Sequence, residues 1–119
     1  MCHWVSYENP DDVSDSRYTY SRSAVNLFEV PSEQLPPSPG DMERFIHPDD
    51  LVRVMEQYKQ SGLSPVPYCI CYRLSRPDGS VLWVEEVSEP VIGSGGGITH
   101  TFGTMTEIPA PPAAAQPRD

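Results

Sequence analysis

Three histidines and three cysteines are among the few side chains of this 119-residue chain that could do chemistry. A histidine close to a serine or cysteine and a carboxylate would indicate nucleophilic catalysis. No such triad can be assembled from His3, His47 and His100, which are scattered along the sequence. We therefore predict no catalytic residues. A satisfied or solvent-facing histidine is the simpler interpretation of His100, and a ligand contact is the alternative if its strand turns it toward the helices.

Acidic residues form the second candidate cluster, because carboxylates are metal ligands. Glu85, Glu86 and Glu89 lie close together in the sequence, and Asp49 and Asp50 precede them. No Asp-rich calcium-loop spacing is present. Acidic side chains on strands are more often solvated than metal-bound, so we expect these to be solvated and predict no metal site.

The cysteines and the glycine run also indicate no chemistry. Cys69 and Cys71 are two residues apart on a predicted strand and point the same way, which is poor geometry for a disulfide and is not zinc-finger spacing. With Cys2 they read as reduced thiols of a cytoplasmic protein. The run from Gly93 to Gly97 lacks the Lys-Ser/Thr of a phosphate loop and reads as a turn.

Net charge excludes two classes of partner. The chain carries 8 Lys and Arg against 17 Asp and Glu, a formal net charge of −9. Nucleic-acid binding requires clustered basic residues, and an anionic membrane would repel this surface. No apolar run approaches the roughly 20 residues of a bilayer span, and no secretory signal is visible. We expect no nucleic-acid or membrane partner and a cytoplasmic location.

One helix is the element most strongly indicated. His47 is the expected cap residue, Pro48 suits the first helical position, and Asp49 and Asp50 place negative charge in the first turn. Apolar residues then recur at helical spacing, and Gly62 is the expected stop. The stripe comprises Leu51, Val54, Met55 and Tyr58.

Strands flank this helix on both sides in the sequence. Alternation predicts strands at 3–8, 17–20, 68–75, 80–91 and 98–108. Asp78-Gly79 predicts a tight hairpin between the third and fourth strands. Short helical segments are expected between Ala24 and Phe28 and over 41–45, with a proline-rich stretch between them. This order predicts an α+β fold with an antiparallel sheet.

An ordered set of motifs resembles a PAS domain of the subgroup with a His-Pro-Asp-Asp helix start. The set comprises Phe45-Ile46-His47-Pro48-Asp49-Asp50, Tyr72-Arg73-Leu74, Asp78-Gly79, Trp83-Val84, Phe102-Gly103 and Thr106-Glu107-Ile108. The resemblance implies a five-stranded antiparallel sheet in the order 2-1-5-4-3 with short helices packed on one face. We assign 1–108 to this PAS-like sensory domain and 109–119 to a disordered Pro/Ala-rich tail or linker.

The resemblance also implies a function. Such domains are sensory or interaction modules of bacterial signalling proteins, for example sensor histidine kinases or cyclic-dinucleotide enzymes, and are not themselves catalytic. Pro109 interrupts the helix that commonly leads to an output domain, which puts tight helical coupling to a kinase in doubt. The alternative is a stand-alone small-ligand-binding or enzymatic α+β protein.

No cofactor can be assigned. The Asn-Cys-Arg-Phe-Leu motif of flavin photoreceptors is absent, and the segment from Pro48 to Gly62 contains no histidine that could serve as an axial haem ligand. Photoreceptor-type flavin and haem are therefore both disfavoured.

The layer between the long helix and the sheet is the candidate ligand pocket, for a small organic molecule. Its predicted lining consists of Phe28, Phe45, Val54, Tyr58, Ile70, Tyr72, Leu82, His100 and Phe102. The Tyr58 and Tyr72 hydroxyls require partners, which a ligand or water would supply. In the alternative, the hydroxyls reach the rim and the layer is simply packed. Val81 and Trp83 share the other face of the hairpin and are the predicted homodimer interface.

Overall fold

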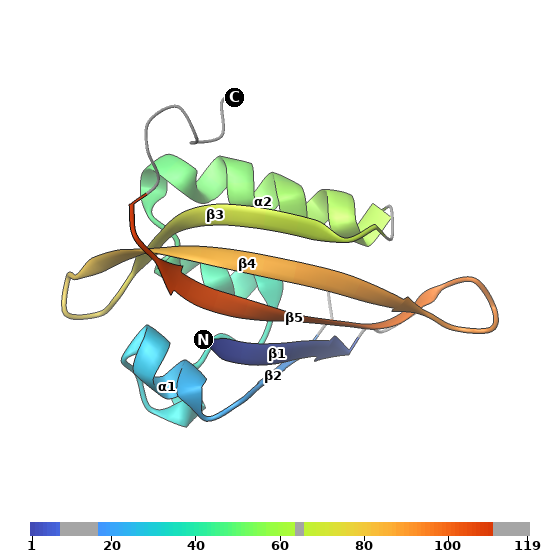
Figure 1. The fold of residues 1–119 in the computed structure, drawn as a ribbon, viewed down its shortest axis with the longest axis horizontal. Helices are drawn as coiled ribbons and strands as arrows, with labels where there is room; N and C mark the ends of the chain where they lie inside the picture. Colours follow the sequence, from blue (N-terminus) through green and yellow to red (C-terminus); the bar gives the residue numbers. More distant parts are fainter. Residues whose placement is uncertain (8–16, 64–65, 111–119) are drawn as a thin grey trace.

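The computed structural model describes residues 1–7, 17–63 and 66–110, which form one antiparallel sheet and its covering helices (Figure 1). The strands are β1 (Cys2–Tyr7), β2 (Arg17–Tyr20), β3 (Tyr68–Ser75), β4 (Val81–Ile92) and β5 (Ile98–Ile108). The helices are α1 (Ser23–Phe28), α2 (Pro48–Leu63) and the 3-10 segments η2 (Ser32–Gln34) and η3 (Pro39–Phe45). The strand order β2-β1-β5-β4-β3 confirms the predicted topology. The predicted tail at 111–119 and residue 8 of the first predicted strand lie outside the described residues.

Helix α2 begins as its sequence predicts. The ring Nδ1 of His47 accepts a hydrogen bond from the backbone N–H of Asp49 at 3.1 Å, so His47 caps the first turn. The helix ends at Leu63, one residue beyond the predicted stop at Gly62. Figure 1 shows α2 running along β3, the strand at one edge of the sheet.

The exposed edge of β3 is paired to the start of α2 through one residue. The backbone N–H of Arg73 donates to Oδ2 of Asp50 at 2.8 Å, and its carbonyl accepts from the N–H of His47 at 3.0 Å. The Arg73 guanidinium also binds both Asp50 oxygens, at 2.9 and 2.8 Å. These bonds satisfy edge groups that would otherwise be open to another chain, and they fix the helix on the sheet.

A tight turn joins β3 to β4. The N–H of Gly79 donates to the carbonyl of Arg76 at 3.0 Å, and the N–H of Arg76 donates to the carbonyl of Ser80 at 2.9 Å. Gly79 has a φ of 90°, which confirms that the Asp78-Gly79 pair needs a residue tolerant of positive φ. This turn sets the register of the two strands, with Tyr72 opposite Val84.

Alternation along the strands separates two faces. On β4, Leu82, Val84, Glu86 and Ser88 are buried beneath the helices, whereas the residues between them are more exposed. On β5 the buried positions are Gly103 and Met105. A Cβ on Gly103 would lie 1.9 Å from the Val87 carbonyl and 2.7 Å from the Trp4 ring, so a side chain cannot be placed there.

Candidate functional site

A buried carboxylate surrounded by three tyrosines is the most unusual group on the helix-facing side of the sheet. Glu86 lies on β4 between β3 and β5, and its register partners are Ile70 and Met105. Only 3% of its surface is exposed. A buried charge or carboxyl group is costly unless hydrogen bonds compensate it, so the neighbours of Glu86 decide what it can do.

All the hydrogen bonds to the Glu86 side chain within the described residues come from phenol groups. Oε1 accepts from the Tyr58 hydroxyl at 2.9 Å and from the Tyr72 hydroxyl at 2.8 Å, and Oε2 accepts from the Tyr68 hydroxyl at 2.5 Å. Tyr58 comes from α2, while Tyr68 and Tyr72 come from β3. The carboxyl group therefore joins the helix to the sheet. We call these four residues the Glu86–tyrosine cluster.

Burial governs the electrostatics of the Glu86–tyrosine cluster. Loss of solvation raises the pKa of Glu86 above its ordinary value, and the three phenol hydrogen bonds oppose the rise without cancelling it. Burial and the nearby Glu86 carboxylate together raise the pKa values of Tyr58, Tyr68 and Tyr72. The phenols therefore remain neutral donors through the physiological range, and the carboxyl is the group that titrates.

The prediction that the acidic residues are solvated is wrong for Glu86 and also for Asp50, which is buried against Arg73. The sequence contained the signal, because Glu86 alternates in phase with Leu82, Val84 and Ser88 on the buried face. Glu85 lies on the opposite face, and Glu89 is exposed. The prediction failed because it relied on the general preference of glutamate for solvent and not on the position of Glu86 in the alternating pattern of β4. Among the described residues, no group of three metal-ligating side chains is close enough to hold an ion.

Most of the predicted pocket residues do pack together. Phe28, Phe45, Val54, Ile70, Tyr72 and Leu82 belong to one buried cluster, with Tyr58 packed against it. The rings of Phe28 and Phe45 are edge-to-face at 5.1 Å. The hydroxyl partner expected for Tyr58 and Tyr72 is the side chain of Glu86, a group from the chain itself.

The structure does not bring His100 and Phe102 into this layer. Phe102 is 45% exposed, and the His100 ring contacts the exposed Tyr7 ring, 6.1 Å away between centroids. Gly103 and Met105 occupy the buried phase of β5, so the predicted place of Phe102 in the pocket is wrong. The ligand-contact alternative for His100 is wrong for the same reason, and its position agrees with the simpler interpretation of a histidine that does not face the helices. The side chain of Trp4 fills the space beside Gly103, which requires a residue without a Cβ.

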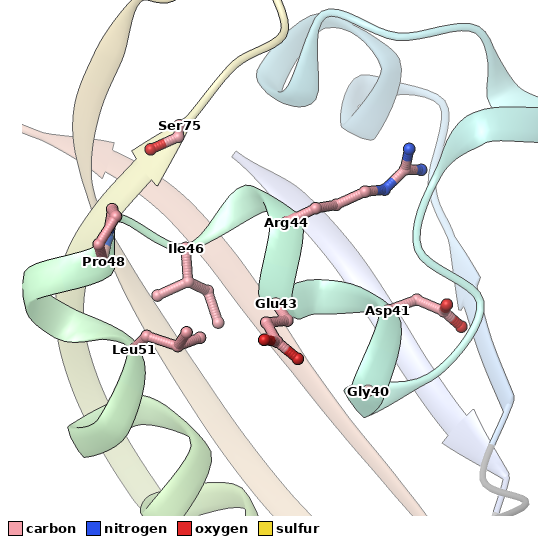
Figure 2. A pocket seen from close by; sticks show the side chains of 8 residues that line it. All are labelled: Gly40, Asp41, Glu43, Arg44, Ile46, Pro48, Leu51 and Ser75. Carbon is pink, nitrogen blue, oxygen red and sulfur yellow. The ribbon is translucent and has the colours of Figure 1, made fainter.

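A separate open cavity of about 630 Å³ lies between η3 and the start of α2 (Figure 2). Ile46 and Leu51 project into the space between the two helices, while Arg44 extends away and donates to the Gln34 carbonyl at 2.6 Å. The lining consists of Gly40, Asp41, Glu43, Arg44, Ile46, Pro48, Leu51 and Ser75. The sequence did not predict this hollow, because it depends on how the irregular segment η3 packs against α2.

The helix-free face of the sheet carries the predicted interface residues. Val81 is 50% exposed, and Trp83 is partly covered by the Arg73 guanidinium, 5.3 Å from the ring centroid. Phe102 lies on the central strand β5 opposite Val5. We call this surface the outer sheet face; its apolar members are Val5, Tyr7, Val81, Trp83, Val87, Phe102 and Ile108.

A family model for the PAS fold matches residues 17–105, and the strand order agrees with it. The chain belongs to the PAS fold family. Solved structures agree with this PAS assignment. The N-terminal domain of a diguanylate cyclase with a PAS/PAC sensor from Marinobacter aquaeolei aligns with a TM-score of 0.74 at 19% identity, over 88% of this chain and 94% of that one. The His-Pro-Asp-Asp subgroup stays a prediction.

Two further structures show how widely the PAS fold is used. A sensory box histidine kinase/response regulator from Burkholderia thailandensis aligns with a TM-score of 0.65 at 20% identity, over 90% of this chain and 76% of that one. A light-oxygen-voltage domain with a flavin analogue aligns with a TM-score of 0.71 at 17% identity, over 92% of this chain and 78% of that one. A search of curated proteins finds no match. No helix in the described ranges is long and apolar enough to span a membrane.

Proposed function

We propose that this PAS domain is a non-catalytic sensory and interaction module of a bacterial signalling protein, and that it pairs with a second copy through the outer sheet face. Its output partner would be a histidine kinase or a cyclic-dinucleotide enzyme, in line with the proteins that contain its structural neighbours. A cytoplasmic location is part of this proposal, and the three free thiols fit a reducing compartment.

The observation that carries the proposal is the apolar character of the outer sheet face. Phe102 and Val81 expose 45% and 50% of their surface. The face runs from Val5 on β1 across β5 to β4, so its apolar members lie on three adjacent strands. Glu85, Thr104 and Thr106 lie on the same face between Trp83 and Phe102, so the proposal rests on exposed apolar side chains at several points of one helix-free face.

A second copy of the chain fits the outer sheet face better than a charged partner does. Apolar side chains of each copy would be buried in a two-fold contact, which would also include Glu85 and Thr106 of the same face. The net charge of −9 on each copy opposes association, so the apolar contact must supply the attraction.

Sedimentation velocity over a range of concentrations tests this. We expect the wild type to show a concentration-dependent dimer, and Phe102→Glu and Trp83→Glu to remain monomeric with unchanged circular dichroism. Val52→Glu is the matched control, because Val52 is 82% exposed on α2 and lies away from the outer sheet face. A monomeric wild type, or dimers that persist in both outer-face variants, would refute the pairing.

Sensing of a small organic ligand is a second candidate function. The open cavity between η3 and α2 favours it, because a volume of about 630 Å³ falls within the roughly 300–1,000 Å³ of small-molecule sites. The lining combines apolar Ile46 and Leu51 with the carboxylates of Asp41 and Glu43 and with Arg44, which suits an apolar ligand that carries a polar or charged group.

A further inference from the structure

We propose that Glu86 and Tyr68 form a proton-operated latch that controls how tightly α2 is held on the sheet. This inference rests on the proposed sensory function and adds a regulating signal to it, namely uptake or release of one proton. It begins from the geometry of the Glu86–tyrosine cluster, in which one carboxyl group joins α2 to β3.

The donors and acceptors around the Glu86 carboxyl group show where the proton is held. An ionised carboxylate accepts from all three phenols, two at Oε1 and one at Oε2. When Oε2 is protonated it becomes a donor, and the Tyr68 oxygen, 2.5 Å away, is its nearest acceptor. The Tyr68 hydroxyl hydrogen must then turn away from Glu86. Oε1 still accepts from Tyr58 and Tyr72, so one hydroxyl rotation accommodates the proton.

Tyr68 is also the route by which that proton reaches solvent. Tyr72 is fully buried, whereas Tyr58 on α2 and Tyr68 at the first position of β3 are half-buried. Of the two half-buried phenols only Tyr68 bonds to Oε2, and its hydroxyl also lies close to the buried side chain of Ser88. A proton can pass between water and Oε2 through this group without opening the core around Tyr72.

The groups that face Glu86 do not neutralise its charge. Helix α2 contributes Tyr58, and β3 contributes Tyr68 and Tyr72. Strand β2 contributes Tyr20, with Tyr18 near the cluster, and β1 contributes Cys2. Burial raises the pKa of Tyr20 and of Cys2, the latter to about 11, so both stay neutral at physiological pH. On β5 the neighbour is the uncharged Met105. None of these named groups carries a positive charge.

The direction of the response follows. Because burial raises the pKa of Glu86, the packed layer binds the proton more tightly than the unfolded chain does. The contribution of Glu86 protonation to the stability of the folded state is complete below 4.5, the ordinary pKa of the group. This contribution is lost as the pH rises through the pKa of Glu86 in the folded state. Ionisation favours states in which the carboxylate reaches water. Neighbouring strands flank Glu86 on both sides, so lifting the Tyr58 half of α2 gives that access.

The test combines carboxyl ¹³C NMR with amide hydrogen exchange on the full chain, between about pH 4 and pH 9. We expect the Glu86 carboxyl to titrate above 4.5 and the protection of α2 residues 56–61 to fall through the same pH range. Each unit of pKa elevation corresponds to about a tenfold loss of protection. Glu86→Gln should remove this pH dependence, whereas Glu85→Gln, on the other face of β4, should retain it.

Tyr68→Phe gives an independent measurement if Glu86→Gln does not fold. Removing the Tyr68 hydroxyl deletes a hydrogen bond that favours the carboxylate, so the pKa of Glu86 should rise further and proton exchange should slow. Titration of Glu86 at or below 4.5 would overturn the latch, as would equal pH dependence of α2 protection in wild type and Glu86→Gln. Sedimentation of the same samples reports dimerisation separately, so failure of the latch and failure of the proposed pairing are distinguishable.

Discussion

At the residue scale, two buried carboxylates show how partners decide the behaviour of the same chemical group. Asp50 is 4% exposed and Glu86 is 3% exposed. Burial acts to raise the pKa of both groups, but the hydrogen bonds and charge of Arg73, with the charge of Arg53, lower the pKa of Asp50 below its ordinary value. Phenols carry no charge, so burial prevails at Glu86. Asp50 is consequently a fixed anion, while Glu86 can titrate.

Asp50→Asn should be strongly destabilising, because it leaves the Arg73 guanidinium without its bidentate partner at the start of α2. Breaking a buried pair costs about 3–5 kcal/mol, and the partial exposure of Arg73, whose side chain is 29% accessible, favours the lower end. Urea unfolding at pH 7 measures the loss. Asp49→Asn is the control, because the Asp49 side chain is 73% exposed and lies 3.9 Å from Arg73; a comparable loss there would contradict the assignment.

The pH dependence of Asp50 has the opposite sign to that of Glu86. A depressed pKa in the folded state contributes stability that is present above the unfolded value near 3.8 and is lost as pH falls through the folded value. The loss of stability caused by protonation of Asp50 therefore occurs below pH 3.8, and the loss caused by ionisation of Glu86 occurs above pH 4.5. Asp50→Asn should abolish the loss of stability below pH 3.8 and leave the loss above pH 4.5 unchanged.

At the element scale, the sequence predicts what depends on local signals. The cap at His47, the stripe of α2 and the Asp78-Gly79 turn are each encoded within a few residues, and the structure confirms all three. The face of β5 is different, because it depends on register. Its connection to β4 is a turn with the same two backbone hydrogen bonds as the β3–β4 turn, but the glycine-rich sequence from 93 to 97 does not indicate which glycine takes the positive φ, and the ladder shifts at Val91 and Ile92. Phe102, and His100 in its ligand-contact alternative, were therefore assigned to the wrong face.

Gly79→Val should destabilise the hairpin by about 1–3 kcal/mol through backbone strain. The cause is conformational, because a Cβ on Gly79 would meet nothing within 4 Å and the φ of 90° is the difficulty. Gly95→Val is the matched control, since a Cβ there also meets nothing within 4 Å and Gly95 has no positive φ. Denaturant midpoints of the two variants decide the matter; equal midpoints would contradict the strain at Gly79.

At the scale of the whole molecule, the fold presents three separate regions, of which the sequence predicted two. The layer between α2 and the sheet holds the Glu86–tyrosine cluster, the outer sheet face carries exposed apolar residues such as Val81 and Phe102, and the open cavity lies between η3 and α2. The predicted pocket lay in the first of these. The structure shows its central residues closely packed, with Val54 and Tyr72 at 0% exposure. A ligand therefore has easier access to the cavity than to the layer.

Fragment screening by amide shifts separates these two places. We expect bound fragments to perturb residues around the cavity, such as Ile46, Leu51 and Ser75, and to leave 54–58 and 70–74 unperturbed. Gly40→Trp should abolish binding, because a side chain at Gly40 enters open space on the cavity lining. The variant should keep wild-type stability, since nothing within 4 Å opposes a Cβ there.

Val54→Trp is the complementary variant, because Val54 lies on α2 and is fully buried in the layer between this helix and the sheet. Overpacking should cost about 1–3 kcal/mol of stability, yet fragments that bind the cavity should still bind. Shifts at Tyr58, Ile70 and Tyr72 in wild type, lost in Val54→Trp and retained in Gly40→Trp, would show instead that the layer opens to ligands. The Glu86 carboxyl would then be exchanging its tyrosine partners for a ligand, and the signal would enter beside the proton latch.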